Sequence, residues 1–308
     1  MQNVRGTKSR LFLSLLLVAV LAVGALGLFG CSSDDEASSD GASEDKGTLR
    51  IGWIPWDEDV AVTYLWKNVL EDEGYDVELT QLDVAPVYDG VGNGDLDLFF
   101  EAWLPVTHSD YWAEYGDSME DLGAWYDKGL LTWAVPDYVD AVSIEDLVGM
   151  EDDFDGQIIG IEPGAGLMRM SREDVMPGYG LDDYTLIEGS TPAMLAELER
   201  ATGAEENVIV TLWRPHWAYG AYDIRDLEDP QKLLGGAEEI RTLARQDFTA
   251  DFPEVAEWMQ NWVMDDDSMA SLVLTVMRDF DAGQEEEAVE SWLSDADNRA
   301  LVDGWIGK

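Results

Sequence analysis

Short apolar segments alternate with amphipathic ones along residues 48–226, and this alternation limits the fold more than any other feature of the sequence. Residues 47–56 alternate polar and apolar side chains as a strand does, and residues 57–74 have the periodicity of an amphipathic helix with an acidic start. Residues 96–105 and 206–215 are almost wholly apolar, which is typical of buried parallel strands. Strands that alternate with helices predict βαβ units and a parallel sheet.

The pattern changes after Asp226, where four helical segments are predicted at 229–245, 252–262, 267–280 and 285–306. Together these features predict an α/β protein with two lobes joined by a hinge, and a ligand in the cleft at the carboxyl ends of the strands. We expect the chain to cross between the lobes near residues 134–137 and again near 213–219. The first lobe would then comprise residues 48–134 and 219–308, and the second residues 135–218.

The N-terminus has the features of a secretory signal. Residues 1–30 have a basic start and then a long apolar run that ends just before Cys31. The segment resembles the signal of a bacterial lipoprotein, in which the cysteine is lipidated and holds the protein to a membrane without spanning it. The run is also long enough for an uncleaved membrane anchor, which is the alternative. Because Cys31 is the only cysteine, an intrachain disulfide and a cysteine-based metal site are excluded.

Residues 31–47 have no apolar side chain larger than alanine after the cysteine, so we expect them to form a flexible tether.

The chain is strongly acidic, with a formal net charge of −47. Solubility is one reason for an acidic surface, but at this magnitude we favour a halophile's extracytoplasmic protein, because molar salt reduces the Debye length to about 3 Å. The same charge argues against nucleic acid as a partner.

Motifs for catalysis, cofactors and metals are missing from the sequence. It has no nucleophile elbow, P-loop, dinucleotide fingerprint or zinc-protease motif. The acidic clusters 152–153 and 265–267 lack the spacing of a calcium loop. We therefore expect no enzyme activity, no cofactor and no bound metal. A lipid-anchored hydrolase that uses His108 or His216 with a carboxylate is the remaining catalytic alternative.

Tryptophans beside prolines mark three predicted strand ends. The chain has thirteen tryptophans. The three segments are 52–58 with Trp53, Pro55 and Trp56, 101–108 with Trp103, Pro105 and His108, and 211–217 with Trp213, Pro215, His216 and Trp217. Indole faces that converge on a cleft suit a quaternary ammonium, which each ring attracts by about 0.5–2 kcal/mol. Core packing is the alternative for each of them, and it is our prediction for the tryptophans in helical patterns, which are Trp66, Trp112, Trp258, Trp262 and Trp292.

Residues 159–168 read as a strand, a glycine-rich turn and the start of a helix. The main-chain N–H groups near Gly166 and Leu167 could therefore receive an anion, although an ordinary turn between strand and helix is the alternative. A cage for a cation beside an acceptor site for an anion describes a zwitterion with a trimethylammonium head and a carboxylate tail.

Four segments, 74–108, 125–139, 158–168 and 212–232, resemble the glycine betaine-binding lipoproteins of ABC-type compatible-solute importers. The resemblance implies a two-lobed periplasmic-binding-protein fold of type II-like topology that closes on its ligand. It implies that Trp56, Trp103 and Trp213 box the trimethylammonium group. The carboxylate would be bound by His108 and by the main chain of Gly166 and Leu167. Trp53, Trp217 and His216 are secondary candidates for the same roles.

The resemblance also implies partners and a location. We expect a membrane permease and its cytoplasmic ATPase as partners, and an extracytoplasmic protein anchored by lipid on Cys31. A choline receptor of the same fold is an alternative, since it keeps the cage without needing the carboxylate donors. Proline betaine, carnitine, ectoine and sulfonium analogues are further ligands that the residues do not rank. A purely structural surface protein is the other alternative.

Overall fold

The computed structural model describes residues 46–308. The predicted signal peptide (1–30), the lipidation residue Cys31 and nearly all of the acidic tether (31–47) lie outside the described residues. The described residues belong to one compact unit. Within them, none of the helices combines the length and the hydropathy that crossing a bilayer requires.

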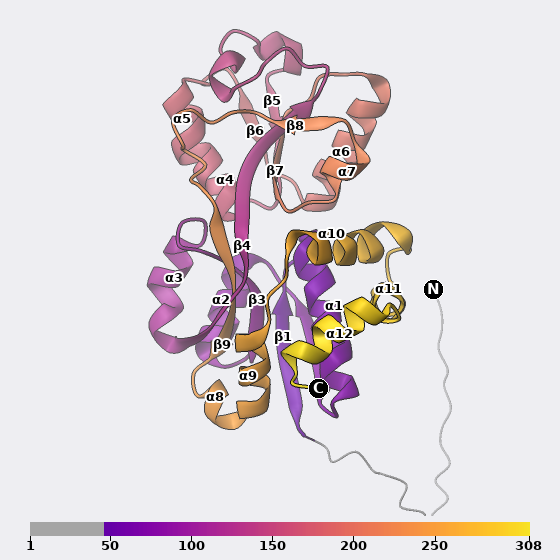
Figure 1. Ribbon diagram of the computed structural model, residues 1–308. Coiled ribbons are helices and arrows are strands. Elements are labelled where there is room, and N and C mark those ends of the chain that lie inside the picture. Colours follow the sequence, from indigo (N-terminus) through magenta and orange to yellow (C-terminus); the bar gives the residue numbers. More distant parts are fainter. Residues whose placement is uncertain (1–45) are drawn as a thin grey trace, which may run out of the picture. The chain divides into compact units, whose positions relative to one another are not determined.

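A mixed sheet of nine strands runs through this unit. The strands are β1 (Thr48–Trp53), β2 (Asp76–Gln81), β3 (Leu98–Leu104), β4 (Met119–Pro136), β5 (Gln157–Ile159), β6 (Thr185–Ile187), β7 (Val210–Arg214), β8 (Ile224–Asp226) and β9 (Glu238–Arg245). Their order is β2-β1-β3-β9-β4-β7-β5-β6, and β8 pairs with β4 off this path. The 18-residue strand β4 runs from one half of the unit to the other (Figure 1).

The two ends of the sheet are parallel and its middle is antiparallel. Strand β1 pairs in parallel with β2 and β3, and β5 pairs in parallel with β6 and β7. Strand β9 is antiparallel to both β3 and β4, and β4 is antiparallel to β7 and β8. The predicted parallel sheet is therefore correct for the βαβ units and wrong for the centre. The predicted lobe boundaries stay a prediction.

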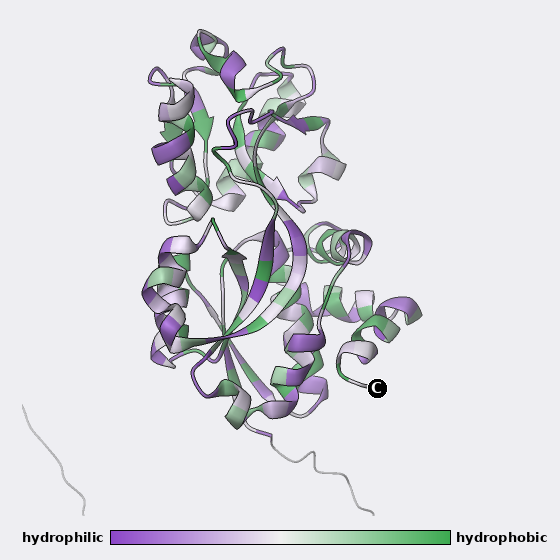
Figure 2. Cartoon of the chain, turned by 60° about the vertical axis from the view of Figure 1, so that its left-hand side comes forward, coloured by the Kyte–Doolittle hydropathy of each residue, from purple (hydrophilic) through white to green (hydrophobic). Residues whose placement is uncertain are grey.

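Helices cover the strands. They are α1 (Asp57–Asp72), α2 (Val84–Asn93), α3 (Ser109–Tyr115), α4 (Gly166–Met170), α5 (Met176–Tyr179), α6 (Thr191–Ala204), α7 (Ala218–Ala221), α8 (Phe248–Asp251), α9 (Pro253–Asn261), α10 (Asp266–Leu274), α11 (Glu285–Leu293) and α12 (Ala296–Trp305). The C-terminal helices lie beside the N-terminal strands and helices, and α11 packs against α1 (Figure 1). Figure 2 shows hydrophobic residues along the strands and many hydrophilic residues on the outer helices.

Several tryptophans form the core beneath these helices. Trp66 and Trp262 are fully buried with ring centroids 5.4 Å apart, and Trp262 stacks on Trp125 at 4.7 Å. Trp258 and Trp292 are also buried. The packing role predicted for these helical tryptophans is confirmed, whereas Trp112 is only partly buried.

One helical prediction is wrong. Residues 229–245 were expected to be helical, but their second half forms β9 between β3 and β4. The sequence of β9 is rich in glutamate, arginine, leucine and alanine, all of which favour helices in isolation. Alternate burial of Glu238, Ile240 and Thr242 fits a strand, and pairing with two neighbouring strands overrides the local preference.

Candidate functional site

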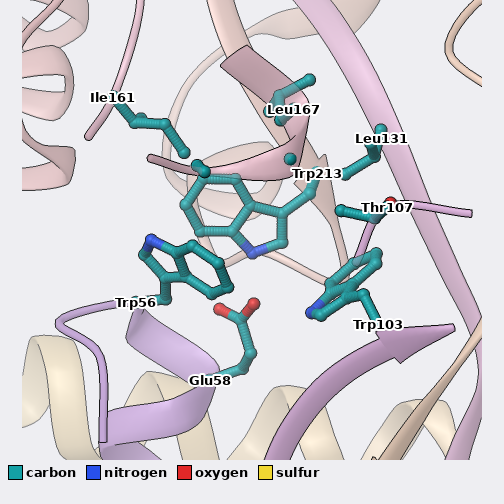
Figure 3. Close-up of a pocket in the computed structure, with 10 residues that line it drawn as sticks. Trp56, Glu58, Trp103, Thr107, Leu131, Ile161, Leu167 and Trp213 are labelled. Atoms are coloured by element: carbon teal, nitrogen blue, oxygen red, sulfur yellow. The ribbon is translucent and has the colours of Figure 1, made fainter. Parts of the chain in front are cut away.

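Three tryptophans from separate segments lie around one cavity. Trp56 directly precedes α1, Trp103 lies near the end of β3, and Trp213 lies in β7. The space between them, including its opening to solvent, measures about 260 Å³ (Figure 3). Its lining residues are Trp56, Glu58, Trp103, Thr107, Leu131, Ile161, Ala165, Gly166, Leu167 and Trp213. The structure thus brings together the three tryptophans and both main-chain positions that the sequence singled out.

The central strands position two of the rings. Trp213 pairs with Leu131 of β4, and both residues line the cavity. Trp103 lies against Gly129 of the same strand, where an added Cβ would lie 2.8 Å from the Trp103 ring. Glycine at position 129 therefore allows the Trp103 indole to pack closely against β4. Trp56 is the third of these rings, and its centroid lies 6.3 Å from that of Trp213.

Carboxylates hold the N–H edges of two of these rings. Trp56 Nε1 donates to Glu162 Oε2 at 3.3 Å, and Trp103 Nε1 donates to Glu101 Oε1 at 2.6 Å. Trp213 Nε1 has no hydrogen-bond partner among the described residues. An acid at the N–H edge restrains the orientation of the ring, which favours a cation against the ring faces.

His108 lies beside the cavity and is fully buried, but it is not one of the lining residues. Its Nδ1 accepts a hydrogen bond from Trp103 N at 3.1 Å, so the proton of the neutral ring is on Nε2. This Nε2 has no partner within residues 46–308. Burial lowers the pKa of His108 to about 3, so the ring is neutral at physiological pH. Its ring stacks on Trp56 at 5.8 Å.

Gly166 and Leu167 are the first two residues of α4. Main-chain N–H groups at such positions have no partner within their own helix. An added Cβ on Gly166 would lie 2.2 Å from the carbonyl oxygen of Thr107, so only glycine permits this contact. Thr107 in turn donates its main-chain N–H to Glu238 Oε2 at 2.9 Å. Two segments far apart in sequence therefore meet at the cavity through a close main-chain contact.

The secondary candidates lie outside the cavity. Trp53 is partly buried and packs edge-on against Tyr64 at 6.3 Å. His216 and Trp217 line a separate hollow of about 800 Å³. Trp217 Nε1 donates to Asp57, and His216 Nε2 lies 3.4 Å from the same carboxylate. Burial lowers the pKa of His216 to about 3, so this ring is neutral and braces the segment after β7.

Sequence reasoning missed half of the residues that line the cavity. These are Glu58, Thr107, Leu131, Ile161 and Ala165. Of the ten described lining residues, Glu58 alone has an ionisable side chain. Its position two residues after Trp56 could have indicated Glu58, but acids are common in the first turn of a helix, so this position does not single it out. Nowhere in residues 46–308 do three or more histidine, cysteine, aspartate or glutamate residues gather in a way that could hold a metal ion.

A family model described as the substrate-binding domain of ABC-type glycine betaine transport systems matches residues 47–295. The match includes all of the residues that line the cavity. The chain belongs to this family. Members of the family are transport binding proteins, so the expectation that the chain is not an enzyme is confirmed and the hydrolase alternative is removed.

Solved structures of ABC-transporter binding proteins share the fold. The chain is 31% identical to lactococcal OpuAC, which was solved in its closed-liganded conformation with glycine betaine. The match covers 84% of this chain and 99% of that one, with a TM-score of 0.78. An ABC-transporter choline-binding protein in complex with choline is 25% identical, with coverages of 84% and 91% and a TM-score of 0.77. The predicted two-lobed periplasmic-binding-protein fold is confirmed by these matches.

A relative known by sequence matches over a shorter segment. The glycine betaine/carnitine transport binding protein GbuC of Listeria monocytogenes is 33% identical over 138 residues, which is 44% of this chain. The segment spans 45% of that relative, so less than half of its length is compared.

Proposed function

We propose that this protein captures glycine betaine in the cavity between its two lobes and delivers it to an ABC importer. The observation that supports this most is the placement of three indole rings, from three separate segments, around one small cavity. A trimethylammonium group has no N–H to donate and loses little hydration, so aromatic faces can hold it by cation–π attraction. The acids at the N–H edges of Trp56 and Trp103 restrain the orientation of these two rings.

We infer that the ligand's carboxylate is bound by the main-chain N–H groups of Gly166 and Leu167, which begin α4 and line the cavity. The third donor would be the buried Nε2–H of His108, whose ring stacks on Trp56. A buried donor without a partner is costly, and an entering carboxylate would remove that cost. The choice of glycine betaine as the ligand is supported by the 31% identical lactococcal relative, whose structure was solved with glycine betaine.

Isothermal titration of the purified protein in molar salt, with glycine betaine and choline as separate ligands, tests the proposal. We expect saturable binding of glycine betaine. Binding of choline without betaine would favour the second candidate, a choline receptor, for which the choline complex of a 25% identical relative is the specific support. Failure of both ligands to bind folded protein would overturn the proposed function.

Replacing His108 by asparagine is expected to weaken binding of glycine betaine by at least tenfold. The asparagine Oδ1 can still accept the hydrogen bond from Trp103 N, but the Nε2–H donor is lost. A hydrogen bond to a carboxylate contributes about 1.5–3 kcal/mol. Choline has no carboxylate, so its affinity should remain within about threefold of wild type if the box is intact. Equal losses for both ligands in the two titrations would contradict the role of His108.

We further propose that the protein is extracytoplasmic, is anchored to the membrane by lipid on Cys31, and works with a permease and an ATPase in osmoprotection. Mass spectrometry of the protein purified from membranes tests the anchor. A diacylglyceryl group on a chain that begins at Cys31 is the expected result, and a retained residue 1–30 segment would support an uncleaved anchor instead.

The net charge of −47 predicts a protein that needs salt. At a Debye length of about 10 Å in 0.1 M salt, neighbouring surface acids repel each other, whereas molar salt shortens that length to about 3 Å. We expect the midpoint of thermal unfolding, measured by circular dichroism, to rise by ~10 °C between these conditions. An equal molar concentration of sucrose controls for effects other than screening. Equal midpoints of thermal unfolding in 0.1 M and in molar salt would contradict the halophilic assignment.

A further inference from the structure

Glu58 combines deep burial with an absence of partners. The residue is 1% exposed and lines the cavity. Neither of its carboxyl oxygens has a hydrogen-bond partner within the described part of the chain. Figure 3 shows the carboxyl group directed toward the space between Trp56, Trp103 and Trp213. A polar group in this state is costly, so it is expected to have a purpose in the ligand-bound protein.

The acids on either side of Glu58 are different. Asp59 accepts hydrogen bonds from Ile54 N at 2.7 Å and from Thr63 Oγ1 at 3.1 Å, so it caps the loop and first turn of α1. Asp57 accepts a hydrogen bond from Trp217 Nε1. These two carboxylates therefore have structural roles. Glu58 makes no hydrogen bond to another described residue that would give it such a role, although it lies in the same helical turn. The Trp213 indole N–H and the Glu101 carboxyl lie close to Glu58 and act to lower its pKa, but burial outweighs them.

The surroundings of Glu58 disfavour its negative charge when nothing positive is present. Burial, and to a smaller extent the charge of Asp57, raises the pKa of Glu58 to about 8. The pKa of Glu101 is also raised, first by burial and then by the charges of Glu58 and Asp59. The titratable groups around the site are Asp57 and Asp59 on α1, Glu101 on β3, Glu162 after β5, neutral His108 before α3, and Arg278, which acts on Asp57.

We propose that Glu58 is the counter-ion that selects for positive charge on the ligand's head group, an inference that rests on the proposed function. When the site closes over a quaternary ammonium, the carboxylate keeps its negative charge and faces the cation. When the site closes over an uncharged group of the same shape, Glu58 takes up one proton from solvent. The site therefore takes quaternary ammonium compounds as a class and rejects their uncharged isosteres.

The proposal fixes the direction of a pH effect. The two closed complexes differ in the pKa of Glu58. Burial raises this pKa to about 8, an uncharged occupant leaves that effect unopposed, and a cation lowers the pKa. The preference for the cation therefore grows as pH rises from the lower pKa toward about 8, and it is constant above that value. Each unit of difference between the two pKa values changes the ratio of affinities about tenfold. The state of the open, empty protein cancels in this ratio.

Two matched ligand pairs test the inference. Glycine betaine is compared with 3,3-dimethylbutanoate, and choline with 3,3-dimethylbutan-1-ol. Within each pair, the ligands differ only in the central atom of the head group, which is nitrogen in one and carbon in the other. For wild type, we expect the affinity ratio within a bound pair to rise at least tenfold between about pH 6 and about pH 9. For Glu58→Gln, we expect a smaller ratio with a weaker dependence on pH. Asp57 and Asp59 remain in this variant, and burial raises their pKa values to about 6 and about 7. Glu58→Asp keeps the carboxylate and should keep the pH dependence.

Glu199→Gln is the matched control, because Glu199 lies exposed on α6 outside the cavity. It should behave as wild type. If the quaternary ligand binds Glu58→Gln as tightly as wild type, with the same ratio at every pH, Glu58 is not the counter-ion and only the proposed function stands. If an isostere binds too weakly to measure, a tenfold loss of the quaternary ligand in Glu58→Gln still supports the inference, and no loss overturns it. If wild type binds neither quaternary ligand, the proposed function itself fails.

Discussion

Trp103→Ala is expected to bind glycine betaine at least tenfold more weakly than wild type. The substitution removes one ring face from the box, a loss of about 0.5–2 kcal/mol in cation–π attraction, together with apolar contact to the methyl groups. A tenfold change corresponds to about 1.4 kcal/mol. The main-chain N–H of Trp103 remains in the variant, so the hydrogen bond to His108 Nδ1 is kept. The expected loss therefore reports on the indole, including its hydrogen bond to Glu101.

The comparison for this variant is Trp112→Ala. Trp112 lies in α3, is partly buried, and does not line the cavity. It should bind glycine betaine as wild type does, while an identical loss in both variants would indicate general damage to the fold. An unchanged dissociation constant for folded Trp103→Ala, measured by isothermal titration, would remove Trp103 from the site.

Gly166→Ala is expected to weaken ligand binding by at least tenfold, because the added methyl group would displace the main chain at the start of α4. Its Cβ would lie 2.2 Å from the Thr107 carbonyl oxygen, a distance that no relaxed structure contains. Thr107 cannot easily move, because Glu238 accepts hydrogen bonds from its main-chain N–H and from that of Val106. The start of α4 must then move away from the cavity, which separates the two walls and displaces the predicted carboxylate donors.

Gly164→Ala provides the matched control two residues away. Its added Cβ would approach only Tyr111 Oη, at the ordinary contact distance of 3.9 Å. Titration should show wild-type affinity for Gly164→Ala and a large loss for Gly166→Ala. Equal affinities for the two variants would show that the contact between Gly166 and Thr107 does not shape the bound state.

Most of the fold could be predicted because burial periodicity dominates its outer strands and helices. The βαβ order of residues 48–104 and the helices after residue 252 follow from local pattern. Strand β9 could not be predicted in the same way, because its composition favours a helix and its strand state depends on β3 and β4. The antiparallel centre of the sheet arises from long-range pairings that leave little mark on local sequence.

The candidate site could be predicted where a residue type and a local motif coincide. Tryptophan beside proline at strand ends indicated five residues, and the family resemblance selected Trp56, Trp103 and Trp213, which line one cavity. The choice between these and Trp53 or Trp217 depends on which way each ring points, and the sequence contains no such information. Glu58 was missed because its distinguishing property, a buried carboxyl without a partner, exists only in three dimensions.

The most direct test of the tryptophan box is a crystal structure of the protein with glycine betaine. We predict the trimethylammonium group between the faces of Trp56, Trp103 and Trp213, with the carboxylate toward His108 Nε2 and the amides of Gly166 and Leu167. A betaine molecule bound elsewhere, with the three indoles packed only against one another, would contradict the account.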